Sequence, residues 1–232
     1  MLLLHGFTSS LDTVNGFIPG CQERGWDYRM PTLRGHGTQP EDLVGVTWQD
    51  WLDDARAALI ELQDDVVVVG LSMGGLLALH LAAEHPGRIK GVVSAATCLR
   101  FRSPLIHVLP LISRRYEFWQ GSPDYADPEL IKLDTNYPRF PVKTFVGLFS
   151  YCQVVDELLI RVEAPLCILA GKNDPVSHPA AARRIYAKTR SQQKELHWLE
   201  RTRHEIFRDV EREAAISTAF RFAEKQARTA SP

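Results

Sequence analysis

The 232-residue chain lacks several features that would place it in other classes of protein. It has no block of Lys or Arg and a formal net charge of -1, which argues against a nucleic-acid surface or a polybasic membrane patch. No apolar stretch approaches the roughly 20 residues of a membrane-spanning helix. The start, Met1 to Leu4, lacks the basic flank and the length of a signal peptide. We therefore expect a cytoplasmic protein with a small neutral partner, no membrane span and no bound nucleic acid.

Cysteine is also scarce, and its spacing disfavours the usual cysteine-based sites. The four cysteines lie far apart and form no C-x-x-C pair: Cys21, Cys98, Cys152 and Cys167. Cys98 and Cys167 lie at or in expected strands. The sequence therefore favours buried free thiols over disulfides or zinc ligands, and it predicts no metal site.

Short apolar runs alternate with longer helical patterns along most of the chain. The runs typical of strands cover residues 2–4, 28–30, 66–69, 89–94, 166–170 and 195–199. The helical patterns cover residues 48–62, 74–84, 179–188 and 208–224, the first of them entered through Thr47 as N-cap. Apolar strands separated by helices are typical of a doubly wound α/β fold, with a mostly parallel sheet covered on both faces. Catalytic groups then gather at the carboxyl ends of the strands.

The alternation breaks between residues 97 and 164, where prolines interrupt aromatic and aliphatic residues without a strand pattern. We interpret this segment as a small cap inserted into a single domain, residues 1–232. Apolar residues at spacings of three and four predict an amphipathic helix at its end: Phe145, Leu148, Phe149, Cys152, Val155 and Leu159. Such a stripe packs on the core, and in a cap it also roofs the pocket. Phe145 and Phe149 are therefore candidate substrate-binding residues.

Ser72 lies in Gly70-Leu71-Ser72-Met73-Gly74, between an expected strand and an expected helix. A tight strand-to-helix reversal would hold the serine in a strained conformation and expose its hydroxyl, and the glycines would prevent clashes with the neighbouring chain. The N–H of Met73 and the positive end of the helix would then face a developing oxyanion. A glycine-bordered helix cap explains the bare pattern equally well, but the flanking strand and helix favour a nucleophile.

A serine hydroxyl needs a base to accept its proton and a group to orient that base. Among eight histidines, His204 follows the last expected strand through a short loop, and we take it as the candidate base. His178 is the alternative. Asp174 follows the strand at 166–170 and is the candidate acid, and an Asx-type turn before Pro175 is the other reading of this residue.

With these residues assembled, the chain resembles the α/β-hydrolase superfamily, and within it the compact bacterial carboxylesterase and monoacylglycerol lipase group. The matching segments span nearly the whole chain: Leu4-His5-Gly6-Phe7-Thr8, Leu33-Arg34-Gly35-His36-Gly37, Trp48 to Trp51, Gly70 to Gly75, Asn173-Asp174 and His204. The order Ser, Asp, His is that of this fold. Two features depart from the group. The N-terminal hairpin that precedes the His-Gly strand in members is missing, and Arg201, Arg203 and Glu205 make the histidine loop unusually charged.

The resemblance implies two-step ester hydrolysis without a metal or an organic cofactor. His204 would take the Ser72 proton, Asp174 would orient the ring, and the backbone N–H groups of Phe7 and Met73 would hold the oxyanion. A turn closed by His-Gly is the other reading of the loop before Phe7, and His5 is expected to fix the shape of that loop.

The implied substrate is a small carboxylic ester with a short to medium acyl chain, such as a monoacylglycerol. Thioester cleavage, carbon–carbon bond hydrolysis, perhydrolysis and a non-catalytic ligand-binding receptor on the same fold remain open. The sequence leaves the oligomeric state undetermined.

Overall fold

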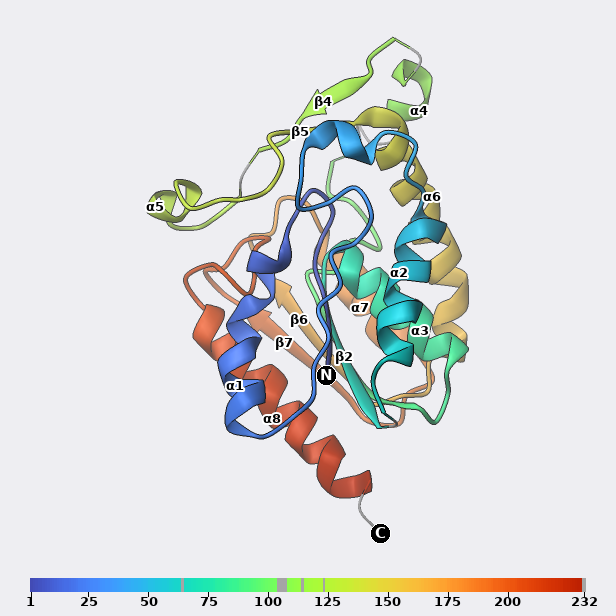
Figure 1. Cartoon of the computed structure of the whole chain (residues 1–232), viewed down its shortest axis with the longest axis vertical. Coiled ribbons are helices and arrows are strands. Elements are labelled where there is room, and N and C mark those ends of the chain that lie inside the picture. The colour runs from blue at the N-terminus through green and yellow to red at the C-terminus, as the bar shows by residue number, and fades with distance from the viewer. Residues whose placement is uncertain (64, 104–107, 114, 123, 231–232) are drawn as a thin grey trace.

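The computed structural model describes residues 1–63, 65–103, 108–113, 115–122 and 124–230. Its centre is a sheet of five parallel strands in the order β1-β2-β3-β6-β7 (Figure 1). The strands are β1 (Leu2–Leu4), β2 (Val66–Leu71), β3 (Ile89–Ala95), β6 (Leu166–Gly171) and β7 (Lys194–Leu199). Each coincides with a predicted run to within two residues at either end. The predicted doubly wound α/β arrangement is confirmed.

The run at residues 28–30 was predicted to be a strand, and this prediction is wrong. Only Arg29 forms a bridge, with Leu2 of β1, through hydrogen bonds of 2.9 Å between its backbone groups and those of Met1 and Leu3. The segment therefore lies beside β1 for one residue. Pro31 has no N–H to continue the ladder, and the chain leaves the sheet there.

Side chains alternate between two buried layers along the strands. One layer packs on α2 (Trp48–Ile60), α3 (Met73–Glu84), α6 (Val142–Leu158) and α7 (Pro179–Lys188). The other packs on α1 (Ile18–Glu23) and α8 (Arg212–Ala230), which lie together on the opposite face (Figure 1). Burial of both faces explains why the strands read as continuous apolar runs.

The first and the last predicted helix differ from the structure at their ends. The first predicted helix begins as expected, because Thr47 and Asp50 form a reciprocal capping box, and it ends two residues early. The last helix begins at Arg212 instead of residue 208, because residues 205–212 form tight turns in which Arg208 and Asp209 donate to the carbonyl of Glu205. It continues through Ala230.

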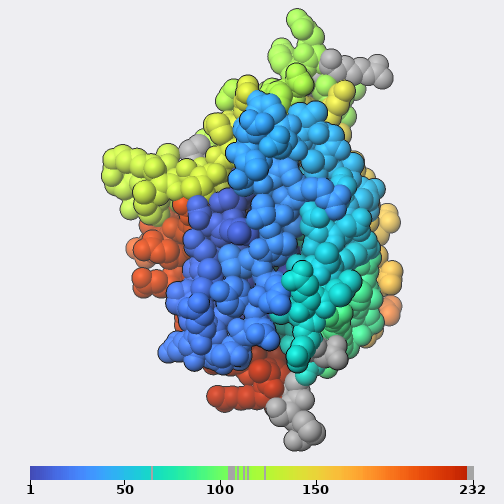
Figure 2. Space-filling model, viewed as in Figure 1, coloured from blue at the N-terminus to red at the C-terminus, as the bar shows by residue number. Residues whose placement is uncertain are grey.

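Residues 97–164, here called the inserted segment, connect β3 to β6. They hold α4 (Leu109–Ile112), α5 (Pro128–Ile131) and a two-stranded antiparallel sheet of β4 (Phe118–Gln120) and β5 (Arg139–Pro141), besides α6. The expectation of no strands here is wrong, because three-residue strands leave no readable alternation. The part with α4, β4, β5 and α5 projects from the upper end of the molecule in Figure 1, and the space-filling view shows the same projection (Figure 2), whereas α6 lies along α2 and α3. The predicted helix at its end is α6.

Among the described residues, no helix combines the length and the apolar composition that a bilayer crossing needs.

The start of α3 lies directly against the end of β1. A Cβ atom added to Gly74 would lie 2.2 Å from the carbonyl oxygen of Leu4 and 2.7 Å from that of His5. These are backbone atoms of the sheet, which cannot yield without moving the strand. Glycine at this position therefore allows α3 to approach β1 and sets the distance between two loops at the strand ends.

We expect Gly74→Ala to lower the free energy of unfolding by about 2–3 kcal/mol, the upper part of the usual range for overpacking. Gly147→Ala is the matched control, because a Cβ atom at this position in α6 would meet nothing within 4 Å. It should raise stability by about 0.5–1 kcal/mol, as alanine favours a helix over glycine. Urea unfolding followed by circular dichroism measures both, and equal effects would contradict this packing.

Candidate active site

Ser72 joins β2 to α3 with φ 56° and ψ -111°. A positive φ is rare for residues with a side chain and requires support from the surrounding structure. The Ser72 N–H donates to the carbonyl of Ala95 at 2.8 Å, and the Ser72 carbonyl accepts from the N–H of Gly75 at 3.1 Å. The turn is therefore held from β3 on one side and from α3 on the other, with the Ser72 side chain at the carboxyl end of β2.

The three predicted catalytic side chains lie in one hydrogen-bonded chain. Ser72 Oγ lies 2.9 Å from His204 Nε2, and His204 Nδ1 lies 2.9 Å from Asp174 Oδ2. With Asp174 ionised, Nδ1–H donates to the carboxylate and Nε2 is left to accept the Ser72 hydroxyl proton. All three residues are buried. The structure thus brings together three segments that are separated by 102 and 30 positions in the sequence.

Asp174 serves two purposes with its two oxygens. Oδ1 accepts the N–H groups of Val176 and Ser177 at 2.8 and 2.9 Å, which is an Asx-type turn. Oδ2 faces His204. The two sequence interpretations of this residue are therefore compatible, because the turn fixes the carboxylate that the histidine contacts.

The electrostatic surroundings of His204 favour its charged form. Burial by itself lowers the pKa of His204, but the Asp174 carboxylate and, next, the Cys98 sulfur outweigh it, so that the pKa lies well above 6.5. The neutral imidazole that can accept a proton is thus populated only as the pH rises through this raised value.

Cys98 contacts both Ser72 and His204, a placement that sequence reasoning missed. Its Sγ lies 3.1 Å from Ser72 Oγ and 3.9 Å from His204 Nε2. When His204 is neutral and accepts the Ser72 hydroxyl proton, the thiol can donate to Ser72 Oγ. The signal was its place just beyond β3, because the carboxyl ends of neighbouring parallel strands meet at one edge of a sheet. The prediction of a buried free thiol is confirmed for all four cysteines.

Two buried histidines fix the loop after β1. The N–H of Leu33 donates to His5 Nε2 and the N–H of Thr8 donates to His36 Nε2, both at 3.1 Å. His5 Nδ1 lies 2.9 Å from the carbonyl of Gly6. Burial lowers the pKa of His5 to about 4 and that of His36 to about 3, so both rings are neutral and can accept these bonds. His5 shapes the loop, as expected.

The loop after β1 lies close to Ser72. A Cβ atom on Gly6 would lie 3.4 Å from Ser72 Cβ, so the segments that hold Gly6 and Ser72 pack against each other. No acceptor is assigned to the N–H of Phe7 or of Met73 among the described residues. These two amides, at the loop and at the start of α3, are the ones predicted from the sequence to face an oxyanion.

His178 and His80 make their contacts away from Ser72. His178 is exposed and caps α7, where its Nδ1 accepts the N–H of Ala180 at 3.0 Å. His80 contacts Tyr151 Oη at 3.1 Å and Glu84 at 3.2 Å on α3. Neither contacts Ser72, so geometry favours His204 over His178 as the base.

Aromatic rings join the loop after β1 to the inserted segment. The Phe7 ring lies 5.7 Å from that of Phe145 and 5.5 Å from that of Phe140, between ring centres. Phe101 lies 5.4 Å from Phe145 and 6.3 Å from Phe149. Phe145 thus reaches the loop directly, whereas the described ring contact of Phe149 is with Phe101.

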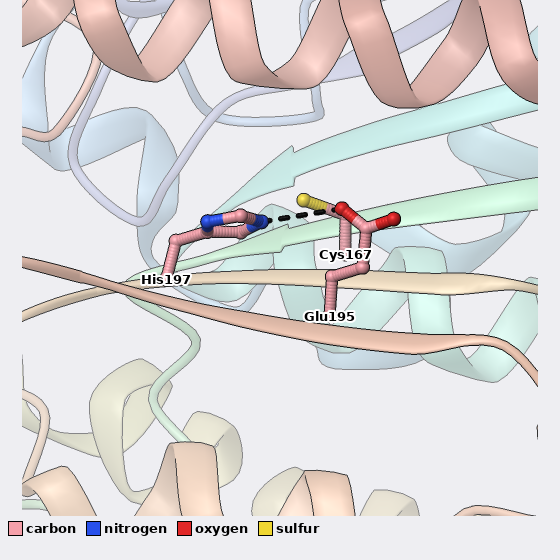
Figure 3. A group of neighbouring side chains, drawn as sticks. All are labelled: Cys167, Glu195 and His197. Carbon is pink, nitrogen blue, oxygen red and sulfur yellow. Dashed lines mark hydrogen bonds and ion pairs between the residues drawn. The ribbon is translucent and has the colours of Figure 1, made fainter.

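One group among the described residues has metal-ligand atoms within 4.8 Å of one another: Cys167, Glu195 and His197. Figure 3 shows Glu195 and His197 on β7 beside Cys167 of β6. His197 Nε2 lies 3.2 Å from Glu195 Oε2, and the Lys225 ammonium faces the other oxygen at 3.4 Å. Burial raises the pKa of Cys167 to about 12, whereas zinc binds the thiolate. The group is therefore arranged as a His197–Glu195 hydrogen bond and a Lys225–Glu195 ion pair beside a protonated thiol.

Two curated relatives match almost the whole chain. A carboxylesterase of Bacillus subtilis (strain 168) is 28% identical over 97% of this chain and 92% of its own length. A thermostable monoacylglycerol lipase of Bacillus sp. (strain H-257) is 28% identical over 98% of this chain and 91% of its own length. The resemblance to this group is therefore confirmed.

A solved structure and a family model agree with these relatives. The structure, from work on the metagenome-derived lipolytic enzymes LipS and LipT, superposes with a TM-score of 0.91 at 31% identity and covers 97% of this chain and 92% of that one. The model of the family described as serine aminopeptidase, S33, matches residues 1–211. On this evidence the chain belongs to the S33 family of α/β-hydrolases.

Proposed function

We propose that the protein is a serine carboxylesterase that hydrolyses short to medium acyl esters, such as monoacylglycerols, through an acyl-enzyme. The observation that carries this proposal is the hydrogen-bonded chain from Ser72 through His204 to Asp174, with both distances at 2.9 Å. The names of the two curated relatives, a carboxylesterase and a monoacylglycerol lipase, support the same bond type.

In the first step Ser72 Oγ attacks the ester carbonyl carbon while His204 Nε2 takes the hydroxyl proton. Asp174 holds the ring and stabilises the imidazolium that forms. The carbonyl oxygen becomes negative and would receive hydrogen bonds from the N–H groups of Phe7 and Met73. Each such donor contributes roughly 3 kcal/mol to stabilisation of the transition state.

In the second half of the cycle the imidazolium of His204 returns its proton to the leaving alcohol, and the acyl group stays on Ser72. A water molecule then attacks the acyl-enzyme and gives its proton to the same nitrogen. The carboxylic acid leaves and Ser72 regains its hydroxyl. One base thus serves both steps, so the Ser72–His204 contact is needed twice.

We infer that residues 1–232 form one domain in which the inserted segment acts as a cap over the site. The contacts of Phe145 with Phe7 support a wall of aromatic rings along the acyl chain, to which Phe149 belongs through Phe101. An apolar wall suits an acyl chain because burial of the methylene groups away from water favours binding. We also infer a cytoplasmic location, because four buried free thiols suit a reducing compartment.

Ser72→Ala and His204→Ala should each lower kcat/KM for p-nitrophenyl butyrate by a factor on the order of 10³ to 10⁶, because triad residues act as a unit. His178→Ala is the matched control and should retain the wild-type rate. Circular dichroism checks that each variant folds. Equal loss in His178→Ala, or full activity in Ser72→Ala, would overturn the assignment.

A substrate panel separates the ester proposal from its rivals. We expect p-nitrophenyl esters to be hydrolysed faster than matched acyl thioesters, anilides and vinylogous diketones. Faster turnover of any rival class, or binding of these compounds without turnover, would contradict the proposal.

We predict that kcat/KM falls as the pH drops through the raised pKa of His204, because the protonated imidazole cannot accept the serine proton. The acid limb of the pH profile should therefore lie above pH 6.5. Asp174→Asn removes the carboxylate that raises this pKa, so its acid limb should move to lower pH while kcat falls about 10⁴-fold. An unchanged limb in the variant would contradict the role of Asp174.

Phe145→Ala should lower kcat/KM for p-nitrophenyl octanoate about tenfold and that for the acetate much less, because two carbons barely reach the aromatic wall. A tenfold change corresponds to about 1.4 kcal/mol, close to the burial of two methylene groups. Leu133→Ala in the same segment is the control, because this side chain is 65% exposed. Equal losses for both esters would place Phe145 outside the acyl site.

A further inference from the structure

The histidine loop, residues 200–211, is bonded to the inserted segment through the backbone of His204 itself. Asp124 Oδ2 accepts the His204 N–H at 3.2 Å, and Asp124 Oδ1 accepts from Arg203 Nε at 2.5 Å. The Asp124 side chain is 13% exposed. One carboxylate of the inserted segment thus holds the backbone of His204 while Asp174 holds its ring.

Two further contacts join the same two parts of the chain. Asp209 is fully buried and accepts the N–H of Ala126 at 3.0 Å and that of Arg203 at 2.8 Å. Asn136 Nδ2 donates to Glu205 Oε1 at 2.9 Å. Two of the charged residues of the histidine loop, Arg203 and Glu205, are therefore in contact with the inserted segment.

From these contacts we propose that Asp124 is a positioning residue for His204: a second carboxylate, supplied by the inserted segment, that completes the active centre when this segment is seated. The inference rests on the proposed function in taking His204 as the base. It goes beyond that function because Asp124 contacts neither Ser72 nor Asp174 in the described contacts, and acts only through the histidine loop.

The charge of Asp124 gives this role an electrostatic signature. The groups that act electrostatically on His204 are Asp174 at the end of β6, Cys98 after β3, Glu205 in its own loop and Asp124 from the inserted segment, and Arg203 is the ion-pair partner of Asp124. A negative charge at Asp124 favours the imidazolium over the imidazole. Loss of this charge alone should therefore lower the pKa of His204, whereas loss of a purely structural contact would leave it unchanged.

Asp124→Asn removes the charge and the bond from Arg203, but its amide oxygen can still accept the His204 N–H. Asp124→Ala removes the charge and both bonds. We expect Asp124→Asn to lower the pKa of the His204 ring, measured by NMR titration of histidine-labelled protein. We expect Asp124→Ala to lower kcat roughly 10- to 100-fold with a much smaller change in KM, since a base displaced by a fraction of an ångström loses reactivity more than the site loses binding.

Asp127→Asn is the matched control. Its carboxylate lies three residues away and accepts the N–H of Glu129 within the inserted segment. It should change neither the pKa of His204 nor kcat. Unchanged pKa in Asp124→Asn, or the same loss in Asp127→Asn, would overturn the proposal, and the Asn variant decides if Asp124→Ala fails to fold.

The ring titration reads the position and charge of His204 without any substrate. A failure of ester hydrolysis in the wild-type protein would therefore overturn the proposed function, whereas an unchanged titration in Asp124→Asn would overturn only the role of Asp124.

Discussion

The site depends on one backbone constraint, the reversal of the chain at Ser72. This residue adopts φ 56° because β2 must end and α3 must begin within a single residue. Both neighbouring glycines are needed: a Cβ atom at Gly70 would lie 2.1 Å from the carbonyl oxygen of Gly74, and one at Gly74 would meet Leu4. Hydrogen bonds of the Ser72 backbone with Ala95 and Gly75 hold this conformation, and the close packing of α3 on β1 supports it.

The other candidate catalytic groups reach this hydroxyl because the sheet is parallel. Asp174 follows β6 and His204 follows β7, and these two strands are neighbours in register. The loop after β1 arrives from the other side, held by His5 and His36. Residues that follow four of the strands therefore meet at one edge, and hydrogen bonds hold the loops that carry them.

Much of this arrangement could be predicted from the sequence, because it follows from local rules. Buried strands are apolar throughout, Thr47 and Asp50 form a capping box, and the glycines around Ser72 mark the turn. Asp174 and His204 were found by their place after strands. The strand predicted at residues 28–30 failed because a three-residue run says little about pairing, and β4 and β5 were missed for the same reason.

Contacts between distant segments were beyond sequence reasoning. Cys98 lies against Ser72, 26 residues away, and Asp124 against His204, 80 residues away. Nothing local to either residue indicates its partner. Such contacts depend on how the inserted segment packs on the sheet. Its short elements and loops determine this packing.

The central claim is that Ser72 is a nucleophile activated by His204. Intact-mass analysis after treatment with a fluorophosphonate, followed by peptide mapping, tests it most directly. The account predicts one adduct per chain, located on Ser72 and formed far more slowly in His204→Ala. A folded protein that stays unmodified, or an adduct on another residue, would contradict it.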